Sequence, residues 1–189
     1  MREHNVCVFC GSSLGNDPSF SHLATSLGET LARTGLGLVY GGASIGLMGK
    51  VADAVLDNGG QVIGVIPEGL RSKELNHKGL TELLITQDMH ERKRIMYERS
   101  DGFIALPGGV GTLEEVFEAA TWTKLGFHSG PKNKPVVLLG GNDFWYPLVD
   151  FLDMLVAAGF VKPNDREIIS YEEGPQDAVD RLLKHFSTR

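Results

Sequence analysis

The stretch SDGFIALPGGVGTLEE, residues 100–115, contains residue types that could bind a phosphate and place a carboxylate beside it. Glycines tolerate positive φ and let another group approach bare backbone, and here they are Gly108, Gly109 and Gly111. Thr112 and Glu115 have the T-x-x-E spacing of a capping box, so we expect Thr112 to be the N-cap of a helix. Backbone N–H groups and the positive end of the helix dipole would then favour a phosphate. A carboxylate beside such a site is unusual and indicates a functional role.

Expected strands and helices alternate along the chain, and they must position this stretch. Short apolar runs typical of buried strands lie at residues 5–10, 37–40, 62–66, 83–86, 103–106, 136–139 and 167–170. Helices are expected at residues 18–34, 45–58, 88–100, 112–125, 144–158 and 175–186. Apolar strands separated by helices imply a parallel sheet that is covered on both faces. We therefore predict one α/β domain over residues 1–189, with a Rossmann-like, doubly wound, mainly parallel sheet.

In such a sheet the ligand binds at the carboxyl ends of the strands. The segments expected there are 10–15, 41–46, 67–74 and 107–112, where glycines are concentrated.

Composition restricts the partners of the protein. The 18 Lys and Arg residues against 24 Asp and Glu residues give a net charge of −6, which argues against nucleic acid as the main partner. No apolar run approaches the roughly 18 residues that a membrane-spanning helix needs. The N-terminal MREHNVCVFCGSS lacks the layout of a signal peptide. We expect a cytoplasmic protein with no membrane partner.

Cys7 and Cys10 have C-x-x-C spacing, which occurs in redox centres and in zinc sites. Both fall in or at the end of the first expected strand, where residues three apart point to opposite faces. The chain has no second cysteine pair to complete a zinc site. We interpret both as core and loop residues in a reducing compartment. The six histidines have no ligand spacing either, so we predict no metal.

Two nucleotide-binding signatures match only in part. A Walker A loop would need glycine at position 44 and a hydroxyl residue at 51, where the chain has Ser44 and Val51. A dinucleotide fingerprint beginning at Gly109 would end at Glu114, whose carboxylate would repel a pyrophosphate. An NTPase and an NAD site are therefore disfavoured. The sequence favours a site for one phosphate.

Motifs along nearly the whole chain resemble the LOG ("lonely guy") family of cytokinin-activating phosphoribohydrolases. PGGVGTLEE at 107–115 matches the family motif PGGxGTxxE, and DMHERK at 88–93 matches the companion motif around M-x-x-R-K. Further similar segments are CGSS at 10–13, GGASIGLMG at 41–49, Thr121-Trp122 and LGFH at 125–128. One departure is HSGPKNKP at 128–135, which is longer than the family's connection and leaves the edge of a dimer interface open.

The resemblance implies hydrolysis of the N-glycosidic bond of cytokinin or adenine nucleoside 5′-monophosphates, without a cofactor. The expected substrates are AMP or N6-isopentenyl-AMP, and the products are free base and ribose 5-phosphate. A homodimer or higher homo-oligomer is expected. The matching catalytic pair is Arg92 and Glu115. The matching substrate-binding positions are Ser12, Gly42, Met48, Glu74, Met89, Lys93, Gly108, Gly109, Val110, Gly111, Thr112 and Glu114.

The chemistry of these residue types agrees with that activity. Breaking a ribosyl C–N bond builds positive charge on the sugar, as in glycoside hydrolysis. The Glu115 carboxylate could stabilise this charge and activate water, or it could serve only as part of the helix cap. The planar guanidinium of Arg92 suits phosphate or ribose oxygens, although a basic run such as 92–94 is commonly a solvated helix face.

One alternative is a non-catalytic carrier of a nucleotide or phosphorylated cofactor, since related Rossmann-like proteins bind a phosphorylated pterin. A carrier need not keep both Arg92 and Glu115. Lysine decarboxylation, a label that relatives have carried, finds no pyridoxal phosphate lysine motif here. The apolar slot that an isopentenylated base would need has no signature in the sequence.

Overall fold

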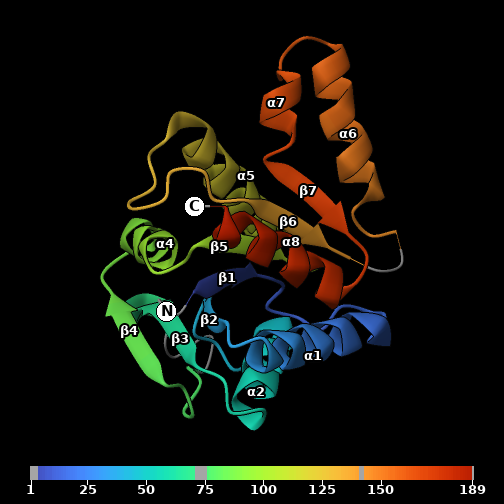
Figure 1. The fold of residues 1–189 in the computed structure, drawn as a ribbon. Coiled ribbons are helices and arrows are strands. Elements are labelled where there is room, and N and C mark those ends of the chain that lie inside the picture. Colours follow the sequence, from blue (N-terminus) through green and yellow to red (C-terminus); the bar gives the residue numbers. More distant parts are fainter. Residues whose placement is uncertain (1–3, 71–75, 141–142, 189) are drawn as a thin grey trace.

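The computed structural model describes residues 4–70, 76–140 and 143–188. A seven-stranded sheet forms its centre (Figure 1). The strands are β1 (Asn5–Phe9), β2 (Gly37–Tyr40), β3 (Val62–Pro67), β4 (Glu82–Thr86), β5 (Gly102–Ala105), β6 (Val136–Leu139) and β7 (Ile169–Glu172). Their order is β4-β3-β2-β1-β5-β6-β7, and every neighbouring pair is parallel. The expected doubly wound α/β arrangement is confirmed.

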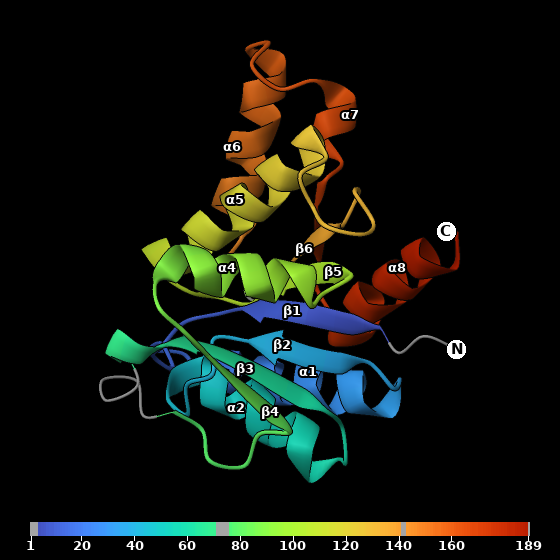
Figure 2. The ribbon, with the colours of Figure 1, turned by 90° about the vertical axis from the view of Figure 1, so that its left-hand side faces the viewer.

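Helices cover both faces of the sheet. One apolar core lies against α1 (Pro18–Arg33), α2 (Gly46–Asp57) and α8 (Pro175–Ser187). The other lies against α4 (Met89–Glu98), α5 (Val110–Leu125) and α6 (Tyr146–Ala157). The short helix α7 (Pro163–Arg166) accompanies α6, and both project beyond the sheet (Figures 1 and 2). A 3₁₀ turn, η1 (Glu68–Leu70), follows β3.

The alternation of side chains along β1 divides the two cysteines between these cores. Cys7 belongs to the core under α4 and α5, and Cys10 to the core under α1 and α2. Both thiols are free and buried. The prediction that they point to opposite faces is therefore confirmed.

The helix after β5 starts earlier than the sequence predicts. Gly109 is its N-cap and Val110 its first residue, and the Leu113 N–H donates to the Gly109 carbonyl over 3.1 Å. The prediction of Thr112 as N-cap was wrong, because the extended backbone of Gly109 already accommodates the turn. The expected N-cap of α4 is confirmed, since Asp88 Oδ1 accepts a hydrogen bond from the Glu91 N–H at 2.8 Å. Glu91 Oε2 in turn accepts from the Gln87 N–H at 2.8 Å, one residue before the N-cap, so the return bond of the capping box is shifted by one residue.

A buried ammonium group holds the carboxyl end of α4. Lys134 is 1% exposed, and its Nζ donates to the carbonyl oxygens of Tyr97 at 2.8 Å and Ser100 at 2.7 Å. A cation at a helix C-terminus binds its last carbonyls and complements the helix dipole. Because Lys134 directly precedes Pro135 and β6, this contact ties α4 to the sheet.

His128, from the same connection, fills the space between α4 and α5. Its ring is 4% exposed and lies against the rings of Phe103, Tyr97 and Trp122, with centroids 5.4, 5.8 and 5.9 Å away. Burial, followed by the charge of Lys134, lowers the pKa of His128 to about 4. The imidazole is therefore neutral at pH 7.

This burial predicts a pH-dependent contribution to stability. In the unfolded chain His128 would take up a proton below about pH 6.5. The unfolded state then binds more protons than the folded one, so stability falls as the pH drops from about 6.5 toward 4. Between pH 7 and pH 5 the loss from this group is about 2 kcal/mol. Chemical denaturation at both pH values measures the free energy of unfolding of the wild type and of His128→Gln. If this free energy fell by the same amount in the two proteins between pH 7 and pH 5, the result would contradict a buried neutral imidazole.

Candidate functional site

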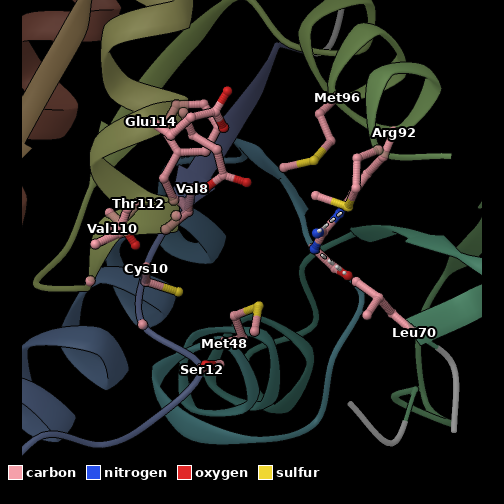
Figure 3. A pocket seen from close by; sticks show the side chains of 17 residues that line it. Val8, Cys10, Ser12, Met48, Leu70, Arg92, Met96, Val110, Thr112 and Glu114 are labelled. Atoms are coloured by element: carbon pink, nitrogen blue, oxygen red, sulfur yellow. Dashed lines mark hydrogen bonds between the residues drawn. The ribbon is translucent and has the colours of Figure 1, made fainter. Parts of the chain in front are cut away.

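A pocket of about 370 Å³ opens at the carboxyl ends of β1 and β5. These neighbouring strands are the point where the chain reverses its winding direction across the sheet, which is where doubly wound folds bind ligands. In Figure 3, Arg92 and Met96 extend from α4 on one side, and Val110, Thr112 and Glu114 lie on α5 on the other. The full lining is Val8, Phe9, Cys10, Gly11, Ser12, Gly41, Met48, Leu70, Met89, Arg92, Met96, Gly109, Val110, Gly111, Thr112, Glu114 and Glu115.

Glycines let three loops meet at the base of this pocket. The Gly11 N–H donates to the carbonyl of Pro107 over 3.1 Å, which joins the loop after β1 to the loop after β5. A Cβ at Gly108 would lie 2.1 Å from Thr112 Oγ1 and 3.0 Å from the Gly11 nitrogen. A Cβ at Gly46, where the loop after β2 enters α2, would lie 2.3 Å from the carbonyl carbon of Ser12. No larger residue fits the positions of Gly46 and Gly108 without displacing backbone or Thr112.

The N-terminus of α5 opens into the pocket. Its N-cap, Gly109, has no side chain to accept hydrogen bonds from the first turn. Gly109, Val110, Gly111 and Thr112 all line the pocket, and a Cβ at either glycine would meet no atom within 4 Å. A long helix with an uncapped first turn provides N–H donors and a positive dipole end to an anion. This arrangement suits one phosphate group.

Arg92 reaches the pocket from α4 and is held from behind by backbone carbonyls. Its Nε donates to Val65 O and its Nη2 to Gly41 O, each at 3.1 Å. The residue is only 6% exposed, so these carbonyls replace part of the water that the guanidinium would otherwise bind. A Cβ at Gly41 would lie 2.2 Å from Nη2, so only glycine leaves room for this guanidinium. Arg92 is therefore a fixed cation in the wall of the pocket, in contrast to the solvated helix face that its basic neighbours suggested.

Carboxylates from α5 complete the polar part of the lining. Glu114 and Glu115 both line the pocket. Burial, followed by the negative charge of Glu115, raises the pKa of the Cys10 thiol well above its usual range. Cys10 is therefore a neutral thiol in the pocket, and it is a poor nucleophile because the thiolate is the reactive form.

Methionines form the apolar part of the lining. Met89, Arg92 and Met96 follow one another at helical spacing on one face of α4, and Met48 comes from α2. Leu70, at the end of η1, adds to this surface. Met96 and Leu70 were not predicted, although the spacing of Met96 from Arg92 could have indicated it.

Three of the predicted binding residues that the structure describes are not in this lining. Gly42 has φ +79° and shapes the turn after β2 behind the pocket, where its Cβ would meet Ile66. Gly108 lies beneath Thr112. Lys93 points away from the pocket toward Glu114 and Glu118. Glu74 lies outside the described residues. The other ten predicted residues, including Arg92 and Glu115, line one pocket.

Within residues 4–70, 76–140 and 143–188, no cluster of three or more His, Cys, Asp or Glu side chains is arranged to hold a metal ion. No helix in the same ranges has the length and apolar character needed to span a membrane.

The structural comparison shows the fold alone. The molybdenum cofactor binding protein of Rippkaea orientalis has a TM-score of 0.73 at 22% identity, and covers 98% of this chain and 99% of its own. The Moco carrier protein of Chlamydomonas reinhardtii has a TM-score of 0.74 at 21% identity, and both chains are fully covered.

The sequence comparison is more specific. A family model described as "possible lysine decarboxylase" matches residues 48–182. A cytokinin riboside 5′-monophosphate phosphoribohydrolase of Rhodococcoides fascians is 50% identical over 86% of this chain and 80% of its own length. One from Arabidopsis thaliana is 46% identical over 95% of this chain and 82% of its own length. The chain therefore belongs to the LOG family, to which these phosphoribohydrolases also belong.

Proposed function

We propose that the protein hydrolyses the N-glycosidic bond of adenine-type nucleoside 5′-monophosphates, releasing free base and ribose 5-phosphate. The observation that carries this proposal is that the N-terminus of α5, Arg92 and Glu115 line the same pocket. A phosphate site, a fixed guanidinium and a carboxylate are the groups that this reaction needs. Relatives that are about half identical to this chain are named for the same reaction.

The 5′-phosphate binds at the first turn of α5 in this proposal. The N–H groups of Val110, Gly111 and Thr112 face the pocket from a helix that has no side-chain cap. The hydroxyl of Ser12 lies across the same opening and can donate to a phosphate oxygen. Anchoring the phosphate fixes the position of the ribose, so that part of the entropic cost of the reaction is met on binding.

The ribose then lies between Glu115 and Arg92. As the C1′–N bond breaks, positive charge grows on the sugar, and the Glu115 carboxylate stabilises that charge. The same carboxylate can accept a proton from the attacking water, whose oxygen becomes the hydroxyl on C1′. That proton passes, from Glu115 or through solvent, to the nitrogen of the departing base, and the carboxylate is regenerated. Arg92 donates to ribose or phosphate oxygens and holds the sugar toward Glu115.

The base lies against the methionine wall in this proposal. Met48, Met89 and Met96 have flexible, polarisable side chains that adapt to irregular apolar shapes. Together with Leu70 they provide an apolar surface for a substituent on N6 of adenine. N6-isopentenyl-AMP is therefore the preferred substrate, and AMP is a weaker one because it leaves this surface without a partner.

A second copy of the chain is the proposed protein partner. Large apolar side chains remain exposed along α5, α6 and the turns that follow them: Phe117, Leu125, Phe127, Phe151, Met154 and Phe160. Apolar patches of this kind commonly mark protein interfaces. We infer a homodimer through this surface, and sedimentation at micromolar concentration that gave a monomer mass would contradict it. The two free cysteines agree with the inferred cytoplasmic location.

The non-catalytic carrier remains the competing function, because the neighbours named as molybdenum cofactor carriers share this fold. A carrier would return its bound nucleotide intact. Chromatography of the incubated nucleotide therefore separates the two functions in one experiment.

One prediction about catalysis concerns Glu115. Glu115→Gln keeps the size of the side chain but removes the charge and the proton acceptor. Release of base from N6-isopentenyl-AMP should fall by roughly 10²–10⁴-fold, the usual contribution of a positioned acid or base. Chromatography of free base and ribose 5-phosphate measures this, with Glu98→Gln on the exposed side of α4 as the control. Wild-type turnover in Glu115→Gln would contradict the assignment, and intact recovery of nucleotide from the wild type would favour the carrier.

Another prediction about catalysis concerns Gly41, which leaves room for Arg92. In Gly41→Ala the new Cβ meets Arg92 Nη2 and Met48 Sδ, both near the ends of flexible side chains, so the fold should persist while Arg92 moves. Turnover should fall by about 10- to 100-fold, because displacements near 1 Å carry such costs. Gly69→Ala is the matched control, since its Cβ meets no atom within 4 Å. Unchanged kcat and KM in Gly41→Ala would show that the position of Arg92 is unimportant.

A further inference from the structure

The two helices that carry the proposed catalytic pair rest on different parts of the sheet. Helix α4 packs on β3 and β4, whereas α5 packs on β1, β5 and β6. They lie side by side on the same face (Figure 2), and the pocket opens between their N-terminal halves. The sheet contacts of each helix hold Arg92 and Glu115 separately, so the rotation of one helix against the other also depends on side chains that span this gap.

Such side chains are present on the facing surfaces of both helices. Lys93 and Tyr97 are four residues apart on α4, and Glu114 and Glu118 are four residues apart on α5, so each pair shares one helix face. Lys93 Nζ lies 2.5 Å from Glu114 Oε1 and 3.0 Å from Glu118 Oε2. The Tyr97 hydroxyl donates to the same Glu118 oxygen at 2.6 Å. Each helix thus contributes two side chains to one network of three contacts.

The cation at the centre of the network is buried, whereas its partners are exposed to different degrees. The side chain of Lys93 is 10% exposed, that of Glu118 26% and that of Glu114 51%. Burial alone would lower the pKa of Lys93, but hydrogen bonds to Glu114 and Glu118 outweigh it and raise that pKa above its usual value. Burial, followed by the bond to Glu118, also raises the pKa of Tyr97. Lys93 therefore stays a cation and Tyr97 a neutral donor.

The position of Lys93 differs from that of a phosphate ligand. Its ammonium points to the outer side of the α4–α5 gap, and it does not line the pocket that holds Arg92 and Glu115. Two of its three N–H groups are directed at carboxylates. Glu114 reaches this network while it also lines the pocket, so it connects the two.

We propose that Lys93 and Glu118 are positioning residues, which fix the rotation of α4 against α5 and thereby hold Arg92 opposite Glu115. Successive helical residues are about 100° apart, so fixing Lys93 also fixes the direction of its neighbour Arg92. Fixing Glu114 does the same for Glu115. This inference rests on the proposed hydrolysis, and it gives Glu118 a role that neither its sequence context nor a pocket position suggested.

The test uses Glu118→Gln, Lys93→Met and the double variant, with N6-isopentenyl-AMP as substrate. Misplacing the catalytic pair should lower kcat by about tenfold or more in each single variant, while KM changes less than about threefold. The double variant should lose little more than either single variant, because the two residues act as one unit. Arg94→Met is the matched control, since it removes an exposed cation of α4 that pairs with Glu98, and it should retain wild-type kcat.

Several results would overturn the inference. Lys93→Met with raised KM, unchanged kcat and no similar effect in Glu118→Gln would make Lys93 a substrate ligand. Additive losses in the double variant would mean independent roles. Loss of thermal stability with wild-type kcat would mean a structural role only. Glu118→Gln, which preserves the size of the side chain but removes the charge that pairs with Lys93, decides the matter if Lys93→Met does not fold. An inactive wild type would overturn the proposed function as well, whereas an active wild type with unchanged variants overturns only this inference.

Discussion

A backbone hydrogen bond from the Gly11 N–H to the carbonyl of Pro107 joins the two loops on which the pocket depends. The loop after β1 leads to α1 on one face of the sheet, and the loop after β5 leads to α5 on the other. Adjacent parallel strands whose helices leave to opposite faces open a crevice between them. The two loops can approach this closely because Gly108 lacks a side chain, since a Cβ there would meet Thr112 and the Gly11 nitrogen. This contact places the first turn of α5 at the bottom of the crevice.

The polar groups of the pocket are held in place, whereas its apolar side chains can adapt. Arg92 is fixed by carbonyls of β3 and of the turn after β2, and the carboxyl end of its helix is held by Lys134. Glu115 lies on a helix whose start is fixed by the glycine loop. Catalysis by electrostatic stabilisation depends on such preorganisation, because groups that need not move cost no reorganisation during the reaction. The methionines of the opposite wall remain adaptable, which suits the part of a substrate that varies.

Local patterns in the sequence predicted the strands, the longer helices and the edge of the sheet that carries the pocket, but not the short helix α7. Strand and helix periods are properties of neighbouring residues, so apolar runs such as 136–139 could be located without a structure. The N-cap of α5 could not be located in this way, because both glycine and threonine are favoured at that position. The structure has the extended N-cap backbone at Gly109. The network of Lys93 with Glu118 joins residues 25 positions apart on two helices, so no local pattern identifies it. The apolar part of the pocket lining likewise comes from separate elements.

The most direct test of the account is a crystal structure of Glu115→Gln with N6-isopentenyl-AMP bound. The account predicts the phosphate on the N–H groups of residues 110–112, the ribose between residue 115 and Arg92, and the isopentenyl group against Met48, Met89 and Met96. A phosphate bound away from α5, or a base placed at the glycine loop with its C1′ far from residue 115, would contradict the account.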